Sequence, residues 1–305
     1  MGGGDMGGAG MSGRGLGTAL VLVAAILWGT TGTAATFAPS AGPIAIGAAA
    51  MGVGGLLQAI IAIGPLRREA RAILRHPWLL AMGGLSVAVY PLAFYAGMHL
   101  SGVAVGTVVA LASGPIFAAI LERVVDGTPL DRRWLSMAGL GILGTALLTV
   151  DGTHGGSARN VPLGVLLALV AGLTYALYTW VARRLMGGGV SSRSAMGAIF
   201  GVGGVLLLPV LVATGAPFLA DTRDLAVAVY MAIVPMFLGY VCFGIGLRTV
   251  SARSATLLTL VEPGVAAVLA WAIVGERLGI LGVLGIVCIG ASLVGLSLPS
   301  GRPKR

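Results

Sequence analysis

The chain has 305 residues, of which 57% are hydrophobic and only 10% are charged, and its mean hydropathy is +1.00. Because soluble domains carry roughly 25% charged residues, this composition excludes an ordinary soluble protein and predicts an all-α membrane protein. The formal net charge of +9 raises the possibility of a nucleic-acid partner, which the placement of the basic residues must decide.

Ten apolar runs of spanning length follow one another along the chain. A transmembrane helix needs about 20 mostly apolar residues, because lipid offers no partner for an unpaired backbone N–H or C=O group. We therefore predict ten transmembrane helices. They cover residues 16–36, 44–63, 78–98, 103–125, 134–150, 162–182, 195–214, 225–247, 254–274 and 279–298.

Nearly all of the 19 Lys and Arg residues fall on one side of these ten spans. With the N-terminus in the cytoplasm, only Arg159, Arg223 and Arg277 fall on the outer side. This is the positive-inside pattern of inner-membrane proteins, so the charge indicates membrane topology and we predict no nucleic-acid partner. Because the number of spans is even, we expect a multi-pass protein of the cell inner membrane with both termini in the cytoplasm.

The two ends of the chain differ from the apolar runs. Residues 1–13 are rich in glycine and are expected to be a disordered leader, while residues 299–305 form a basic cytoplasmic tail. The first apolar run is too long for a signal-peptide core of roughly 7 to 15 residues, so it should remain as the first helix. Between the ends we expect two five-helix units, at 14–151 and 162–298.

These two units look like copies of each other. Trp28 aligns with Tyr175, and a shift of one residue then aligns Pro115 with Pro263 and Gly127 with Gly275. Five spans is an odd number, so the second copy must insert upside down. Inverted repeats around a central cavity are typical of secondary transporters, because exchanging the conformations of the two repeats opens the cavity to alternate sides.

Four short motifs stand at defined places in this duplicated chain. They are Trp28-Gly29-Thr30 in the first span, Gly114-Pro115 in the fourth, Glu262-Pro263 in the ninth and Gly275-Glu276-Arg277-Leu278 before the tenth. In this order they resemble the EamA-type ten-helix exporters of the drug/metabolite transporter (DMT) superfamily, and most of all the YddG-type exporters of aromatic and other amino acids. The resemblance implies a basket of helices around a central cavity that exports amino acids or related small metabolites. In the first half, Gly127-Thr128-Pro129-Leu130 replaces the last motif, which weakens any role of that turn in substrate recognition.

Glu262 is the clearest ionisable residue inside a predicted span. A charge at the centre of a membrane helix costs about 2.5 to 3.5 kcal/mol on insertion scales, so such a residue is a candidate for function. Pro263 cannot donate to the carbonyl group of Thr259, which leaves polar backbone beside the carboxyl group. Glu262 therefore binds a cationic group of the substrate, or titrates in proton coupling, or is a protonated side chain bonded to that backbone. Glu122 and Arg123 are expected to pair with each other near the cytoplasmic end of the fourth span.

Aromatic and hydroxyl side chains within the spans provide candidate walls for the cavity, since small-molecule sites combine apolar walls with a few polar groups. The proposed substrate-binding residues are Trp28, Thr31, Tyr90, Tyr95, Ser113, Gly114, Tyr175, Tyr178, Tyr240 and Glu262. The alternative for each aromatic residue is ordinary packing or a place in the interfacial belt, as expected for Trp78, Trp134 and Trp271 near span ends. Pro115 and Pro263 are candidate hinges, because proline removes a helix hydrogen bond and bends the helix.

Other classes of function are less well supported. The three histidines lie near loops and no metal-ligand spacing occurs, so we predict no enzyme activity, no metal and no cofactor. No P-loop motif is present, so ATP hydrolysis by that route is not expected. A carrier for drugs or quaternary cations, or a solute channel, remains an alternative to amino-acid export. The sequence leaves open the exact substrate, proton coupling and the oligomeric state, with a monomer possible.

Overall fold

The computed structural model describes residues 6–151, 159–275 and 279–297, and no strand occurs among them. Ten helical segments in this part of the chain are long and apolar enough to cross a membrane. The predicted fold class, an all-α membrane protein with ten transmembrane helices, is confirmed. The spans are α1 (Met6–Ala35), α2 (Pro43–Ile61), α4 (Pro77–Ser101), α5 (Val103–Val124), α6 (Arg132–Asp151), α7 (Val161–Gly187), α8 (Ser192–Thr214), the segment from α10 to α11 (Thr222–Gly246), that from α12 through α13 (Ala252–Ile273), and α14 (Ile280–Ser297).

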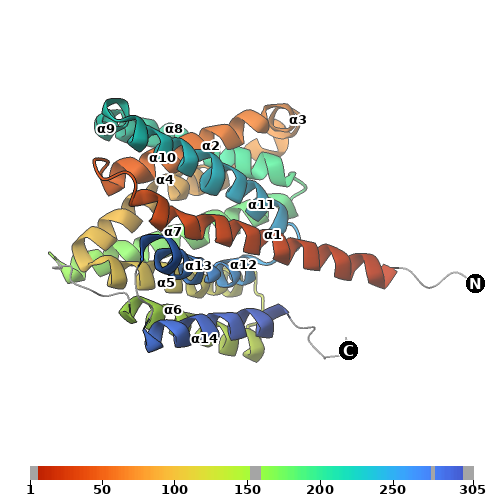
Figure 1. The fold of residues 1–305 in the computed structure, drawn as a ribbon. Coiled ribbons are helices and arrows are strands. Elements are labelled where there is room, and N and C mark those ends of the chain that lie inside the picture. Colours follow the sequence, from red (N-terminus) through yellow and green to blue (C-terminus); the bar gives the residue numbers. More distant parts are fainter. Residues whose placement is uncertain (1–5, 152–158, 276–278, 298–305) are drawn as a thin grey trace, which may run out of the picture.

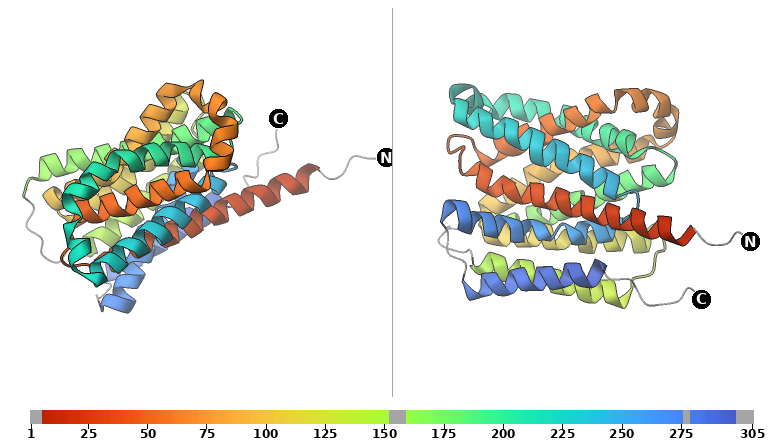
Figure 2. Two further views of the ribbon diagram at one scale, coloured as in Figure 1. Left: turned by 90° about the horizontal axis from the view of Figure 1, so that it is seen from above. Right: turned by 45° about the vertical axis from the view of Figure 1, so that its right-hand side comes forward.

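Each half of the chain contributes five of these spans, and the halves interlock through pairs of antiparallel helices. Helices α2 and α8 lie side by side, and α6 pairs with α14 (Figures 1 and 2). The α2–α8 pair meets at two glycines in matching Gly-Val-Gly-Gly sequences, where a Cβ atom added to Gly55 would lie 3.5 Å from the Cα of Gly204. Small residues at such crossings let the backbones of membrane helices approach closely. Equivalent residues thus meet where α2 and α8 cross, as expected where the pseudo-two-fold axis of an inverted repeat passes between two helices.

The eighth span is interrupted by a π-helical segment. Helix α10 (Thr222–Met231) continues into η1 (Ala232–Leu238) and then into α11 (Gly239–Gly246), and Pro235 lies within η1. The first half of the chain satisfies two carbonyl groups there, because Trp28 Nε1 donates to Pro235 O at 2.9 Å and Gln58 Nε2 donates to Phe237 O at 2.8 Å. Irregular backbone at membrane depth is tolerated when neighbouring helices supply its hydrogen bonds.

The ninth span is broken in the middle. Helix α12 (Ala252–Leu258) ends in a turn at Thr259 and Leu260, after which α13 (Val261–Leu269) and the π-helical segment η2 (Ala270–Val274) follow. The break places Pro263 in the first turn of α13, where a missing N–H leaves no hydrogen bond unmade. Its repeat mate Pro115 lies inside the continuous helix α5.

Three features depart from the sequence-based expectation. Helix α3 (Ile63–Leu74), which carries Arg67, Arg68 and Arg71, and the short α9 (Ala216–Ala220) lie between spans. Helix α1 begins at Met6, within the leader for which we expected disorder, while residues 1–5 and the tail 299–305 lie outside the described residues. Helices α4 and α5 are separated by Gly102 alone, whose φ of +87° is a conformation that favours glycine.

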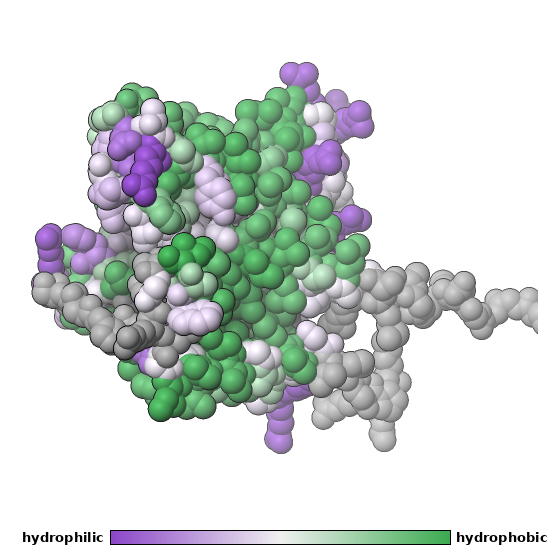
Figure 3. Space-filling model, in the orientation of Figure 1, coloured by the Kyte–Doolittle hydropathy of each residue, from purple (hydrophilic) through white to green (hydrophobic). Residues whose placement is uncertain are grey.

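The two ends of the bundle differ in charge. Helix α1 begins and α14 ends at the same end (Figure 1), as ten crossings require. We call this the basic end, and the opposite end, where Arg159 and Arg223 lie, the distal end. Between them the surface is a hydrophobic band that faces lipid, with hydrophilic residues gathered at the two ends (Figure 3). The arginines that define the basic end are Arg67, Arg68, Arg71, Arg75, Arg123, Arg132, Arg133, Arg183, Arg184, Arg193, Arg248 and Arg253.

Candidate functional site

A cavity of about 1070 Å³ extends from the distal end to the middle of the bundle. Its rim is formed by the turns between α1 and α2 and between α4 and α5, and by the end of α6. Its inner wall comes from five helices of both halves. The residues of that inner wall include Trp28, Gly29, Thr31, Phe94, Tyr95, Leu111, Glu262 and Pro263. We call this space the distal cavity.

A close crossing of α1 and α13 brings Trp28 and Glu262 to the same wall. A Cβ atom added to Gly29 would lie 2.9 Å from the carbonyl oxygen of Glu262 and 2.6 Å from Cβ of Val265. Glycine at position 29 therefore allows the α13 backbone to pack directly against α1. This contact joins two motifs of the sequence analysis, Trp28-Gly29-Thr30 and Glu262-Pro263, in one site.

Glu262 lines the distal cavity as a partly exposed residue. Within the described ranges, no other group forms a hydrogen bond or ion pair with its carboxyl group. The carbonyl group of Thr259, which Pro263 leaves free, accepts a hydrogen bond from the backbone N–H of Glu262 at 2.9 Å. The backbone is thus satisfied without the Glu262 side chain, and the carboxyl group can interact with a solute.

The other predicted residues on this wall present aromatic surface and one hydroxyl group. The indole N–H of Trp28 is used by the bond to Pro235, so the ring offers its π surface to the cavity. The Tyr95 ring packs over Gly47, where an added Cβ atom would lie 2.7 Å from Cδ2 of the tyrosine. Thr31 Oγ1 donates to Trp28 O at 2.7 Å and keeps its lone pairs for a further partner.

Four predicted tyrosines and their neighbours lie deeper, in what we call the aromatic cluster: Trp28, Tyr90, Tyr175, Tyr178, Phe200, Tyr240 and Phe243. The ring centroids of neighbouring members are 4.3 to 6.4 Å apart. Tyr178 and Tyr240 share a hydrogen bond of 2.7 Å between their hydroxyl oxygens, and Tyr175 OH lies 2.7 Å from Thr259 Oγ1. Trp28 is the member that lines the distal cavity. The structure therefore brings these residues together but places the tyrosines beneath the cavity.

Ser113 and Gly114 lie where α5 packs against α7. Ser113 is buried and donates to Ala110 O at 3.2 Å. A Cβ atom added to Gly114 would lie 3.0 Å from Cδ1 of Tyr175, so the lack of a side chain at position 114 leaves room for that ring. Neither residue lines the distal cavity, and Pro115 follows them inside α5. They shape the helix packing around the aromatic cluster.

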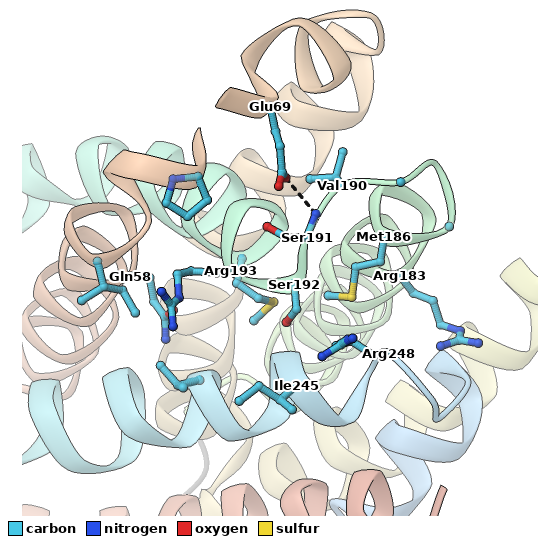
Figure 4. Close-up of a pocket in the computed structure, with 16 residues that line it drawn as sticks. Gln58, Glu69, Arg183, Met186, Val190, Ser191, Ser192, Arg193, Ile245 and Arg248 are labelled. Carbon is cyan, nitrogen blue, oxygen red and sulfur yellow. Dashed lines mark hydrogen bonds between the residues drawn. The ribbon is translucent and has the colours of Figure 1, made fainter. Parts of the chain in front are cut away.

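A second cavity of about 880 Å³ opens at the basic end (Figure 4). Among the described residues, the two cavities share no lining residue, and Gln58 and Met196 form part of the inner surface of this second cavity. This cavity was not predicted from the sequence, because its arginines Arg183, Arg193 and Arg248 were interpreted only as indicators of membrane topology. We call this space the basic-end cavity.

The basic end is also where α5 is joined to the second half by ionic contacts. Glu122 pairs with Arg253 of α12 at 3.2 Å and also accepts from the Arg253 backbone N–H at 3.1 Å. The expected pair of Glu122 with Arg123 is therefore wrong, because the Arg123 side chain is exposed and donates to Gly127 O at 3.4 Å. Asp126 accepts from Trp180 Nε1 of α7 at 2.8 Å. In the part of the chain that the structure describes, no group of three or more His, Cys, Asp or Glu side chains could hold a metal ion.

Ten spans in two inverted halves, with a separate cavity toward each end, define an inverted-repeat membrane transporter. Residues 15–150 and 162–298 each match the EamA-like transporter family. The chain belongs to this family, as the sequence motifs indicated.

Similar proteins are also transporters. The chain is 32% identical to the uncharacterized transporter YwfM of Bacillus subtilis over 93% of this chain and 94% of that protein. It is 26% identical to a probable terminal-alkyne amino-acid exporter of Streptantibioticus cattleyicolor, over 92% of this chain and 98% of the exporter. A crystal structure with 19% sequence identity aligns with a TM-score of 0.74 over 92% of this chain and 95% of its own, which shows the fold.

Proposed function

We propose that this transporter exports amino acids, with neutral and aromatic ones first, or related small metabolites, across the cell inner membrane by alternating access. The basic end faces the cytoplasm together with both termini, in accord with the positive-inside pattern. The role is the movement of a small solute, with no covalent step and no cofactor.

The unpaired carboxyl group of Glu262 among aromatic walls carries this proposal. An α-amino acid offers an ammonium group to that carboxylate, and its side chain meets Trp28 and Tyr95. Thr31 supplies a hydroxyl group nearby. The similarity, along almost the whole chain, to a probable terminal-alkyne amino-acid exporter supports the same substrate class.

The aromatic cluster forms the partition between the two cavities in this proposal. Tyr90, Tyr175, Tyr178 and Tyr240 reach the solute when the halves rock and the partition moves. Ser113 and Gly114 shape the counterpart of the Glu262 wall, since Gly114 is the repeat mate of Glu262. Pro115 and Pro263 serve as the hinges in the paired helices.

A carrier of quaternary cations is the second candidate, and the same wall favours it. A carboxylate beside aromatic rings attracts a quaternary ammonium group through charge and cation–π interactions. Such a solute has no carboxylate, and its charged nitrogen carries no N–H donor. The two candidates therefore differ in the solutes that are transported, which are amino acids in the first and quaternary cations in the second.

Counterflow in proteoliposomes tests the proposal. Vesicles loaded with unlabelled L-phenylalanine, L-leucine, L-lysine or ethidium are diluted into the labelled form of each solute. We expect saturable, transient accumulation of labelled phenylalanine and leucine that requires the same solute inside. Accumulation of ethidium alone would favour the second candidate, and single-channel currents in planar bilayers would favour a pore.

A further inference from the structure

The basic-end cavity differs sharply in charge from the distal cavity. Among the described residues that line the distal cavity, Glu262 is the one Asp, Glu, Lys, Arg or His. The basic-end cavity is lined by three arginines, Arg183, Arg193 and Arg248, and by one carboxylate, Glu69. A solute passing between the two cavities would leave a cationic wall and meet an anionic one.

The two cavities are counterparts under the inverted repeat. When the Gly-Val-Gly-Gly sequences of α2 and α8 are aligned, Ser192 is the mate of Pro43, and Val190 is the mate of Ala41. Ser192 and Val190 line the basic-end cavity, whereas Pro43 and Ala41 line the distal one. Exchange of the two repeat conformations would therefore deepen one cavity as it closes the other. The basic-end cavity thus lies on the solute path of the proposed function.

Two of the three guanidinium groups in this cavity are available to a ligand. Glu69 Oε2 is engaged by the backbone N–H of Ser191 at 2.8 Å, and Arg183 Nη1 donates to Leu247 O. Arg193 and Arg248 are exposed, and no carboxylate in the described ranges pairs with either of them. Figure 4 shows these two side chains on either side of Ser192, the first residue of α8.

We propose that Arg193 and Arg248 bind the carboxylate of the transported solute in the basic-end cavity, before the solute reaches Glu262. Guanidinium groups suit carboxylates because each offers several donors in a planar fork. An amino acid then presents its carboxylate to the arginines at one end of the path and its ammonium group to Glu262 at the other. This inference rests on the proposed function, which places the cavity on the solute path.

The test compares two double variants that remove the same charge from the same end. R193Q/R248Q changes the cavity wall, whereas R67Q/R68Q removes two exposed arginines of α3 that do not line it. Each is assayed for counterflow of L-phenylalanine and of 2-phenylethylamine, which lacks the carboxylate. We expect R193Q/R248Q to raise the KM for phenylalanine about tenfold, the loss expected for a charge-assisted hydrogen bond, with little change in maximal rate. The KM for 2-phenylethylamine should change less than twofold, and R67Q/R68Q should resemble the wild type for both solutes.

Each outcome separates this inference from the proposed function. If the wild type transports no amino acid, the proposed function fails before the variants are compared. If the wild type transports phenylalanine and R193Q/R248Q leaves its KM unchanged, or raises the KM of both solutes alike, the carboxylate site is wrong. The assay is repeated in vesicles without anionic phospholipid, and a KM difference that vanishes there would assign the two arginines to lipid headgroups and contradict the inference.

Discussion

Trp28 and Tyr175 occupy equivalent positions in the two halves, and their rings meet edge to face with centroids 6.4 Å apart. Trp28 lines the distal cavity, whereas Tyr175 lines neither cavity and bonds to Thr259. Equivalent residues thus have different surroundings, which is what two repeats in different conformations require. In the opposite state of the carrier we expect their surroundings to be exchanged.

The hydrogen bond between Tyr178 and Tyr240 should show a strong coupling in stability. Both side chains are buried, with 1% and 2% of their surface exposed, so each single change to phenylalanine leaves one hydroxyl group without a partner. We expect each single variant to lose about 1 kcal/mol of unfolding free energy, and Y178F/Y240F to lose less than the sum of the two. Unfolding of the purified protein in mixed micelles measures these values. Strict additivity of the two losses would contradict the hydrogen bond.

The contact between α1 and α13 predicts opposite behaviour for two glycines of one helix. Gly29→Ala places a methyl group 2.9 Å from the Glu262 carbonyl oxygen, so it should separate the helices, cost about 1 to 3 kcal/mol and impair transport. Gly32 has open space around its Cα, so Gly32→Ala is the matched control and should keep the stability of the wild type. Thermal unfolding of both variants checks this, and because Gly32 also lines the distal cavity, its variant is a control for stability alone. Equal losses in the two variants would mean that the crossing is not as close as described.

The fold was largely predictable from the sequence, because lipid imposes strong rules on apolar runs and on arginine placement. Pro263 indicated an interruption of the ninth span. The sequence did not show that the break, at Thr259 and Leu260, comes before the proline. Helix α3 was missed because its arginines were used only to orient the chain. Its apolar and basic residues recur at the spacing of an amphipathic helix, and this pattern could have revealed it.

The candidate site was predictable only in part. Deep placement in a span identified Trp28 and Glu262, and both line the distal cavity. Depth along a span does not tell which way a side chain points, so Tyr178 and Tyr240 could not be distinguished from cavity residues. The basic-end cavity was missed because it depends on how α3, α8 and α11 meet in space. Such tertiary relations leave no local pattern in one sequence.

Glu262→Gln should weaken the binding of amino acids and have little effect on the stability of the protein. The amide keeps the shape of the side chain but loses the charge that attracts an ammonium group, so we expect the KM for phenylalanine to rise about tenfold with little change in melting temperature. In the wild type, raising the pH ionises more of the carboxyl group and should lower the KM, whereas E262Q should lack this dependence. Asp131→Asn, in the loop between α5 and α6, is the control. A variant with unchanged flux and unchanged pH dependence would remove Glu262 from the mechanism.

The ion pair between Glu122 and Arg253 should stabilise the contact between α5 and α12 at the basic end. Its side chains are 8% and 14% exposed, and the loss of one partner leaves a poorly solvated charge, so E122Q should cost about 3 kcal/mol. The exchanged variant E122R/R253E should recover part of that loss. Arg123→Gln, at an exposed neighbouring position, serves as the control and should be neutral. The melting temperature of the purified variants distinguishes these outcomes, and a stable E122Q protein would show that the pair is dispensable.

Reciprocal accessibility of the two cavities tests alternating access most directly. Single cysteines replace Thr31 in the distal cavity and Ser192 in the basic-end cavity, in a background with Cys242 and Cys288 changed to alanine, and a membrane-impermeant maleimide is added from each side. We predict that Thr31→Cys reacts only from the distal side and Ser192→Cys only from the basic side, and that a transported amino acid changes the two rates in opposite directions. Reaction of both cysteines from one side, or rates that rise and fall together with substrate, would contradict a carrier built from two inverted halves.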